Sequence, residues 1–260
     1  MKKIGFIGMG NMGQALAEGF VKSGVVNTED LYAFAPNFEK LAKNAERIGF
    51  KAIASVNKLV EECDSVFMAC KPYRIESVLE QLGDEIKGKT LISIAAGWDF
   101  GKYSRYLPED VNVQYIMPNT PVSVGAGTVL IEEKNSLRPE DRVQLIEMLE
   151  SVGASVEIPS HLMDAAMAVS GCGPAFFDMV IEALGDGAVK NGIQRKTAYE
   201  LACRTMIGAA KLMLESELHP GDLKDRVCSP AGTTIKGVAA LEEAGVRSAF
   251  IKAVDAVVGK

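Results

Sequence analysis

Residues 3–13 read KIGFIGMGNMG, and this stretch decides the fold of the first half of the chain. Its first six residues form a short apolar run, which is typical of a buried strand. Gly8, Gly10 and Gly13 then follow the spacing G-x-G-x-x-G and open a predicted helix, Asn11–Ser23. The first glycine permits a tight turn, the second lets the backbone approach a pyrophosphate, and the third allows close packing of helix on strand. A glycine-rich turn alone is weak evidence, but its place between strand and helix favours a dinucleotide site.

The same alternation of short apolar runs and longer amphipathic segments continues through about the first 160 residues. Strands are predicted over residues 3–8, 31–35, 51–54, 65–69, 91–95, 111–117, 129–132 and 155–158. The clearest helices between them are predicted over Asn11–Ser23, Phe38–Ile48 and residues 139–152. Such alternation predicts a mainly parallel sheet that is covered by helices on both faces.

After Pro159 the pattern changes to long helical segments without a convincing strand. Helices are predicted over residues 174–191, 197–217, 234–243 and Val246–Val258. Residues 175–189 carry few charges, so a helix there needs burial on several sides, and a second subunit is a natural source of that burial. We therefore predict an α/β Rossmann-type dinucleotide-binding domain over residues 1–159, followed by an all-α dimerisation domain over residues 160–260.

Composition narrows the classes of partner. Of the 260 residues 48% are apolar, which excludes disorder, and the net charge of −6 is spread along the chain, so we expect no nucleic-acid partner. Five widely spaced cysteines without a C-x-x-C pair predict neither a disulfide framework nor a metal site. The N-terminal apolar stretch is broken by glycines, and no run approaches the roughly 20 apolar residues of a membrane span. We expect a cytoplasmic protein that binds no membrane.

The preferred nicotinamide cofactor is read at the end of the second predicted strand. An acid that would grip the ribose hydroxyls of NAD is missing from residues 32–37, YAFAPN. Since such an acid would repel a 2′-phosphate, and since Lys40 and Lys43 lie within reach on the next helix, we expect NADPH, with NADH possible. Asn57 is a candidate ribose or adenine contact, with a cap of a surface turn as an equal alternative.

Two later strand ends are predicted to face the same crevice, because sites in open α/β sheets lie beyond the carboxyl ends of strands. Small residues there let backbone groups approach the nicotinamide. The predicted cofactor contacts are Ile7, Gly8, Gly10, Asn11, Met12, Gly13, Ala35, Asn57, Ala69, Cys70, Lys71, Pro72, Ala95 and Ala96.

Longer motifs carry a resemblance to one family. They are GFIGMGNMGQAL (5–16), CKP (70–72), MPNTPVSVGAG (117–127), SGCGPAF (170–176), HPGDLKD (219–225) and, most specific, VCSPAGTTIK (227–236). Over essentially the whole chain these stretches resemble pyrroline-5-carboxylate reductases. Two residues depart from the family pattern: Ala231 stands where the family usually has glycine, and Cys228 stands where a small hydroxyl residue is common. The resemblance implies reduction of the cyclic imine 1-pyrroline-5-carboxylate to proline, the final step of proline biosynthesis. It also implies intertwined homodimers, often assembled into larger rings.

Substrate binding is assigned to residues 229–234. This stretch precedes a predicted helix, so its free N–H groups, at Gly232 among others, suit a carboxylate, with the hydroxyls of Ser229 or Thr233 as further donors; a plain helix N-cap explains the same pattern. The family pattern suggests that Thr234 hydrogen-bonds the ring nitrogen, and an imine that binds already protonated needs no strong general acid. Glu217 is a candidate to stabilise the positive nitrogen, with His219 nearby, and for both a structural role at a helix end is equally open.

Two other functions remain as alternatives. A β-hydroxyacid dehydrogenase would use a lysine such as Lys190 as general base, but residues 229–235 have no place in that family, and a lysine beside Asn-Gly fits a helix C-terminus. A non-catalytic NAD(P)-binding sensor would keep the nucleotide fold without turnover. The stretch 229–234, which nucleotide binding does not need, argues against a sensor.

Overall fold

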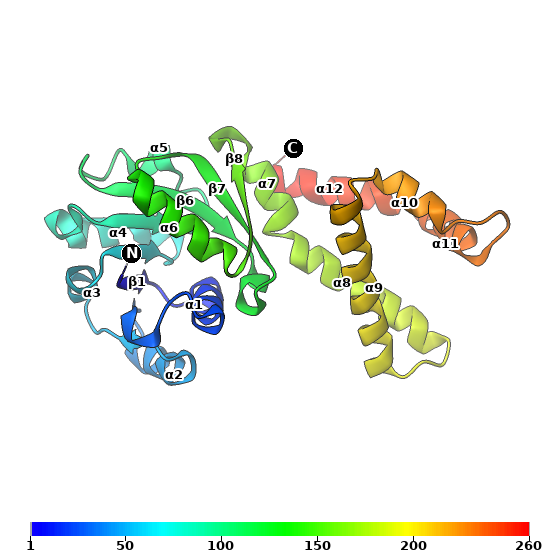
Figure 1. The fold of residues 1–260 in the computed structure, drawn as a ribbon, viewed down its shortest axis with the longest axis horizontal. Helices are drawn as coiled ribbons and strands as arrows, with labels where there is room; N and C mark the ends of the chain where they lie inside the picture. The colour runs from blue at the N-terminus through cyan, green and yellow to red at the C-terminus, as the bar shows by residue number, and fades with distance from the viewer. Residues whose placement is uncertain (1, 260) are drawn as a thin grey trace. The chain divides into compact units, whose positions relative to one another are not determined.

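The structure, a computed structural model, describes residues 2–259 and divides them into two compact units. The first unit ends at Pro174 and the second begins at Ala175 (Figure 1). The first is an α/β unit and the second is all-α, as the sequence predicts.

The first unit is built on an eight-stranded sheet in the order β3-β2-β1-β4-β5-β6-β7-β8. The strands are β1 (Ile4–Ile7), β2 (Leu31–Phe34), β3 (Lys51–Ala52), β4 (Ser65–Met68), β5 (Thr90–Ser93), β6 (Asn112–Pro118), β7 (Gly127–Asn135) and β8 (Gly153–Ile158). All neighbours are parallel except β6 and β7, so the mainly parallel sheet is confirmed. The antiparallel pair follows from the connection, because residues 119–126 are too few for the crossover that parallel strands require.

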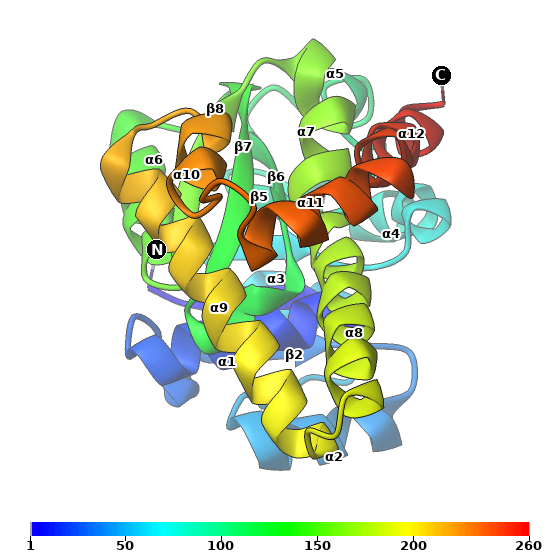
Figure 2. The ribbon, with the colours of Figure 1, turned by 90° about the vertical axis from the view of Figure 1, so that its right-hand side faces the viewer.

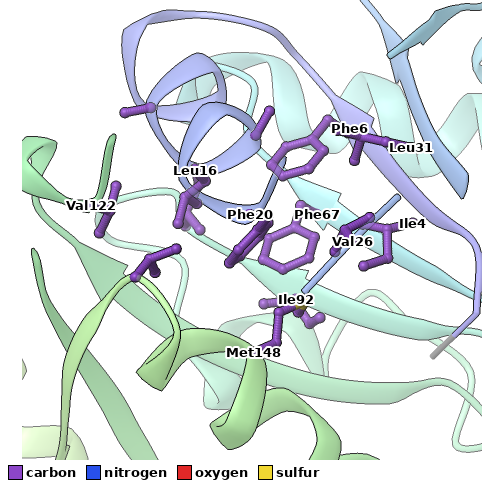
Figure 3. Packing of buried hydrophobic residues seen from close by; sticks show 14 of the residues in the cluster. Ile4, Phe6, Leu16, Phe20, Val26, Leu31, Phe67, Ile92, Val122 and Met148 are labelled. Carbon is purple, nitrogen blue, oxygen red and sulfur yellow. The ribbon is translucent and has the colours of Figure 1, made fainter. Parts of the chain in front are cut away.

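Helices cover both faces of this sheet (Figure 1). They are α1 (Asn11–Ser23), α2 (Phe38–Ile48), α3 (Val56–Glu62), α4 (Ile75–Leu82), α5 (Phe100–Tyr103), α6 (Pro139–Glu150) and α7 (Met163–Ser170). Apolar residues of α1, α2 and α6 form one core cluster with the sheet, and those of α3, α4 and α5 form another. In the first cluster the Phe6 ring stacks on that of Phe67 with centroids 4.7 Å apart, and Phe20 of α1 packs on Phe67 at 5.8 Å (Figure 3). This packing fixes α1, and with it the glycine turn, against the centre of the sheet.

Helix α7 belongs to the compact first unit. It packs on β7, and its Met163 joins a buried cluster with Tyr115, Met117 and Leu130. The unit therefore extends beyond residue 159, where the predicted first domain ends. A functional boundary between residues 159 and 160 stays a prediction.

The second unit contains α8 (Gly173–Lys190), α9 (Arg195–Ser216), α10 (Pro220–Arg226), α11 (Thr233–Glu243) and α12 (Val246–Val258). Helices α8 and α9 form a hairpin (Figure 2), closed by an ion pair between Asp186 and Arg195. Gly185 allows the close approach, because a side chain there would collide with the ring of Tyr199.

Very little of this second unit is buried within one chain. From Ala175 to Gly259 the buried residues are Gly185, Ala198 and Ala202. Large apolar side chains are exposed along its helices: Phe177, Met179, Leu184, Leu201, Ile207, Leu212, Met213, Leu214, Val227, Ile235, Leu241, Phe250, Ile251 and Val257. Apolar area of this extent is typical of a surface that another molecule covers.

One stretch, Ser160–Lys190, is long and apolar enough to cross a membrane by length and composition, with a mean hydropathy of 1.3 in its 18-residue window. The expectation that no run approaches a membrane span is therefore wrong by this criterion, although charged residues such as Asp178 and Glu182 interrupt the stretch. Core helices of water-soluble proteins meet the same criterion, so length and composition alone are weak evidence.

Candidate functional site

A cleft of about 750 Å³ opens beyond the carboxyl ends of β1, β2, β4 and β5. The order of the strands reverses direction there, because β1 lies between β2 and β4. The lining residues are Gly8, Met9, Gly10, Asn11, Met12, Ala35, Pro36, Asn37, Lys40, Leu41, Asn44, Ala69, Cys70, Lys71, Pro72, Tyr73, Arg74, Ile94, Ala95, Ala96 and Thr120. Among the described residues, none that lines the cleft is Asp or Glu, whereas three are cationic.

The three glycines of the turn have separate structural roles. Gly8 has φ +103°, and a Cβ there would lie 2.6 Å from both Ala69 O and Cys70 N, so only glycine lets β1 pass so close to the end of β4. A Cβ at Gly13 would lie 2.9 Å from Gly8 O, so this glycine brings α1 onto the strand. Gly10 differs, because nothing lies within 4 Å of its absent Cβ. Its open side is free for a ligand.

The start of α1 is suited to an anion. Gly10 is the N-cap and makes no side-chain cap hydrogen bond. The first N–H groups of a helix have no acceptor within the helix, and the helix dipole adds positive potential at this end. The amide of Gln14 donates to Met9 O at 3.1 Å and holds the turn. Backbone donors at Asn11 and Met12 therefore line the cleft without a side-chain cap.

The end of β2 brings one of the two predicted lysines to the cleft. Asn37 accepts a hydrogen bond from Lys40 N at 2.9 Å and so caps α2. Lys40 lines the cleft, whereas Lys43 pairs with Glu39 at 2.9 Å and does not line it. Ala35 lines the cleft as predicted.

The end of β4 supplies the predicted residues 69–72 and two that sequence reasoning missed. Tyr73 and Arg74 also line the cleft, and the Arg74 guanidinium lies 5.8 Å from the centroid of the Tyr73 ring. The available signal was their position directly after Lys71-Pro72, where the chain still runs along the crevice. Burial raises the pKa of the Cys70 thiol to about 11, so this cysteine stays protonated at neutral pH and is no nucleophile there.

Three predicted contacts do not line the cleft. Asn57 turns away, since its amide donates to Gln81 O at 3.3 Å and its oxygen accepts from Gln81 Nε2 at 3.1 Å. Ile7 is buried inside the sheet, where its carbonyl accepts from Ala69 N at 2.9 Å, and Gly13 is buried where α1 meets the strand. Roles for Asn57, Ile7 and Gly13 in binding the cofactor stay predictions.

The end of β5 contributes Ala95 and Ala96 to the cleft, as predicted. Ala95 N donates to the Ser93 hydroxyl at 3.3 Å, and Trp98 N donates to Ala95 O at 3.1 Å. Gly97 turns the chain with φ +73°. These bonds give the loop after β5 a defined path beside the cleft.

In the second unit, the stretch 229–234 ends in the first turn of α11. The N-cap is Gly232, which makes no side-chain cap bond, and Gly232 N donates to Ser229 O at 3.0 Å. Within the described chain, no hydrogen bond is formed by the hydroxyls of Ser229, Thr233 or Thr234. A simple N-cap therefore does not account for these hydroxyl residues, and their side chains are free for a ligand.

The two candidates near the end of α9 have structural roles. Glu217 adopts the left-handed conformation, φ 56°, and ends the helix. Nδ1 of His219 accepts from Gly221 N at 3.1 Å and caps α10. Lys190 is the last residue of α8, and the Asn191 side chain donates to Gly187 O at 2.8 Å, so Lys190 lies at the C-terminus of a helix.

The comparisons with known proteins agree with this arrangement. Residues 160–260 match the family model for pyrroline-5-carboxylate reductase dimerisation, and residues 3–97 match that for NADP oxidoreductase, coenzyme F420-dependent. The curated pyrroline-5-carboxylate reductase of Methanosarcina acetivorans is 44% identical over 97% of this chain and 94% of its own length, and that of Escherichia coli is 38% identical over 97% and 94%.

Among solved structures, the pyrroline carboxylate reductase of Plasmodium falciparum with NADP bound is 32% identical and superposes with a TM-score of 0.90. The match covers 98% of this chain and 95% of that one. With curated relatives of this identity over nearly its whole length, the chain belongs to the pyrroline-5-carboxylate reductase family.

Proposed function

We propose that this chain reduces 1-pyrroline-5-carboxylate to L-proline by hydride transfer from NADPH to the imine carbon. The observation that carries the proposal is that one chain contains both a dinucleotide cleft without Asp or Glu and, in residues 229–234, hydroxyls that form no hydrogen bond within residues 2–259. This chain is also 44% identical to a curated reductase. Neither feature alone specifies the reaction. A dinucleotide site serves many chemistries, but the free hydroxyls suit a small anionic substrate.

The cleft fits a nicotinamide dinucleotide. Its volume of about 750 Å³ lies in the range of cofactor sites. The open side of Gly10 and the N–H groups that begin α1 would hold the pyrophosphate, and Ala95 and Ala96 would let the nicotinamide approach the backbone. The bound cofactor supplies the hydride, and the residues of this chain bind and orient it.

NADPH is the preferred cofactor in this proposal because of charge. Lys40, Lys71 and Arg74 line the cleft and form no ion pair within residues 2–259. A 2′-phosphate adds negative charge that these cations attract, and no lining carboxylate opposes it. NADH would bind through the same pyrophosphate contacts without this gain.

In the second unit, residues 229–234 would bind the substrate. The free N–H groups at the start of α11, with the hydroxyls of Ser229 and Thr233, would hold the carboxylate. Thr234 would hydrogen-bond the ring nitrogen, which enters as an iminium and needs no strong acid. Glu217 is exposed and retains its proposed part in stabilising that positive nitrogen.

The exposed apolar helices of the second unit support a homodimer. Side chains such as Met179, at 69% exposure, and Ile207, at 67%, lie on α8 and α9, and a second copy would bury them. Burial of these apolar side chains against a second copy would also explain why Ser160–Lys190 is apolar, with no membrane needed. This is in keeping with a cytoplasmic enzyme. Assembly of dimers into a larger ring is a further step of the proposal.

The test is consumption of NADPH in the presence of 1-pyrroline-5-carboxylate, with a parallel reaction in NADH and direct measurement of proline. Proline that accumulates in step with oxidised cofactor, faster with NADPH, supports the proposal. Folded protein that binds NADPH but forms no proline would reject the reaction and favour the sensor.

A further inference from the structure

The structure contains a buried carboxylate that lies beside the cleft but does not line it. Glu132, in β7, is 0% exposed, and within residues 2–259 it pairs with no cation. One carboxylate oxygen, Oε1, is buried without a hydrogen-bond partner. Burial of a carboxyl group with incomplete hydrogen bonding is costly, and an apolar residue would fill the same space without that cost.

The other oxygen of Glu132 holds the loop that follows β5. Oε2 accepts a hydrogen bond from Phe100 N at 2.8 Å. The helix that begins at Phe100 has a local cap, because Asp99 accepts from Lys102 N at 2.7 Å. The bond to Glu132 satisfies a second free N–H group at the start of α5, and because Glu132 lies in β7 it also fastens the loop to the sheet.

A second buried side chain lies beside the same loop, nearer the cleft. Tyr115, in β6, is 4% exposed, and its hydroxyl lies close to the backbone of Gly97. Gly97 directly follows Ala95 and Ala96, which line the cleft. The loop from Gly97 to Phe100 thus lies beside β6 at one end and is hydrogen-bonded to β7 at the other.

We propose that Glu132 is a positioning residue for the cofactor: through Phe100 N it fixes the loop that presents Ala95 and Ala96. This inference rests on the proposed function in one respect, namely that the nicotinamide half of the cofactor lies at the end of β5. The pyrophosphate and adenosine half would lie at α1, α2 and β4, and within residues 2–259 the Glu132 side chain forms its hydrogen bond to Phe100 and not to those elements.

The chain carries its own reporter of this loop. Trp98 is the single tryptophan of the sequence and is 2% exposed. Its ring packs against Tyr103 at 5.0 Å and Tyr106 at 5.3 Å between centroids. Fluorescence quenching of Trp98 by acrylamide therefore measures access to the loop without any ligand.

The experiment compares Glu132→Leu, which removes the acceptor, with Glu132→Gln, which keeps an amide oxygen for Phe100 N. Glu133→Gln, a change at the exposed neighbour on the same strand, is the control. For Glu132→Leu we expect NADPH to bind about tenfold more weakly, 2′,5′-ADP to bind as in the wild type, and Trp98 to become more accessible to acrylamide. Glu132→Gln should stay within about twofold of the wild type in all three measurements.

Unchanged NADPH affinity and quenching in Glu132→Leu would overturn the inference, and so would equal losses for NADPH and 2′,5′-ADP. If Glu132→Leu does not fold, Glu132→Met, which is closer in length and also lacks an oxygen acceptor for Phe100 N, must show the same split between the two ligands. Because these are binding measurements, wild-type protein that binds NADPH but fails to reduce the imine would overturn the proposed reaction and not this inference.

Discussion

Substitution of Gly10 by alanine should lower cofactor affinity with little change in stability. Gly10 has φ −77° and ψ −171°, a conformation open to any residue, and nothing lies within 4 Å of the position that Cβ would occupy. Alanine restricts the unfolded chain, which stabilises by about 0.4–1 kcal/mol, but it is a poorer N-cap than glycine, which costs a similar amount. For a unit of this size the melting temperature should therefore stay within about 3 °C of the wild type.

Cofactor affinity should fall even though the fold is retained. The added methyl group would occupy the open side of Gly10, where we place the pyrophosphate against the N-terminus of α1. Loss of that close approach should weaken NADPH binding by at least about tenfold, or about 1.4 kcal/mol. Thermal unfolding without ligand and a fluorescence titration with NADPH give the two numbers on the same sample.

Gly8→Ala is the matched contrast within the same turn. Its Cβ would lie 2.6 Å from backbone atoms of Ala69 and Cys70, at a φ of +103°, so we expect a loss of about 2 kcal/mol or more in the free energy of unfolding. Wild-type NADPH affinity in Gly10→Ala would refute the placement of the pyrophosphate. Strong destabilisation of Gly10→Ala would refute the argument from open space.

Four further outcomes are expected. Ala231→Gly should raise the free energy of unfolding by about 0.5–1 kcal/mol in a urea titration, since Ala231 has φ 57°. Thr234→Ala should lower kcat by about tenfold or more with NADPH affinity unchanged, and Thr234→Ser should restore turnover; a loss of affinity instead would reject the role of this hydroxyl. Burial raises the pKa of Cys63 from 9.0 to about 12 and the pKa of Cys70 to about 11. As the pH rises above about 9, the thiols of the unfolded chain lose their protons first, so the free energy of unfolding should fall. This fall should be shallower in the Cys63→Ala/Cys70→Ala variant. Ile207→Glu should halve the mass measured by light scattering if α9 lies in the dimer interface, and an unchanged mass would place the interface elsewhere.

The N-terminal half was predictable because its signals are local. Glycines at fixed spacing and apolar runs of strand length gave all eight strands, and α1 (Asn11–Ser23) and α2 (Phe38–Ile48) begin and end as predicted. The roles of Gly8 and Gly13 also follow from the sequence, because each is required by a backbone contact of the turn itself. Local chemistry of this kind needs no knowledge of distant segments.

The parts that sequence reasoning missed depend on segments far apart in the chain. A glutamate such as Glu132 in a predicted strand would normally face solvent, but α5 packs on β7 and its Phe100 N binds the buried carboxyl group. The sequence predicts Asn57 in the turn after the third strand, whereas it lies in the first turn of α3 and turns to Gln81 in α4. The large apolar side chains of α8 and α9 stay exposed within residues 2–259, and the sequence of one chain does not reveal what covers them.

The stretch 229–234 shows how geometry separates a helix cap from a binding loop. His219, before α10, caps its helix with Nδ1, whereas the start of α11 is capped by Gly232 and leaves the hydroxyls of Ser229 and Thr233 without a partner. Between them Ala231 holds a left-handed conformation that costs an alanine about 1 kcal/mol. Neither the left-handed Ala231 nor these exposed hydroxyls stabilise the folded chain by themselves within residues 2–259. A bound carboxylate would accept from the hydroxyls, so this stretch agrees better with the proposed substrate site than with a side-chain cap of α11.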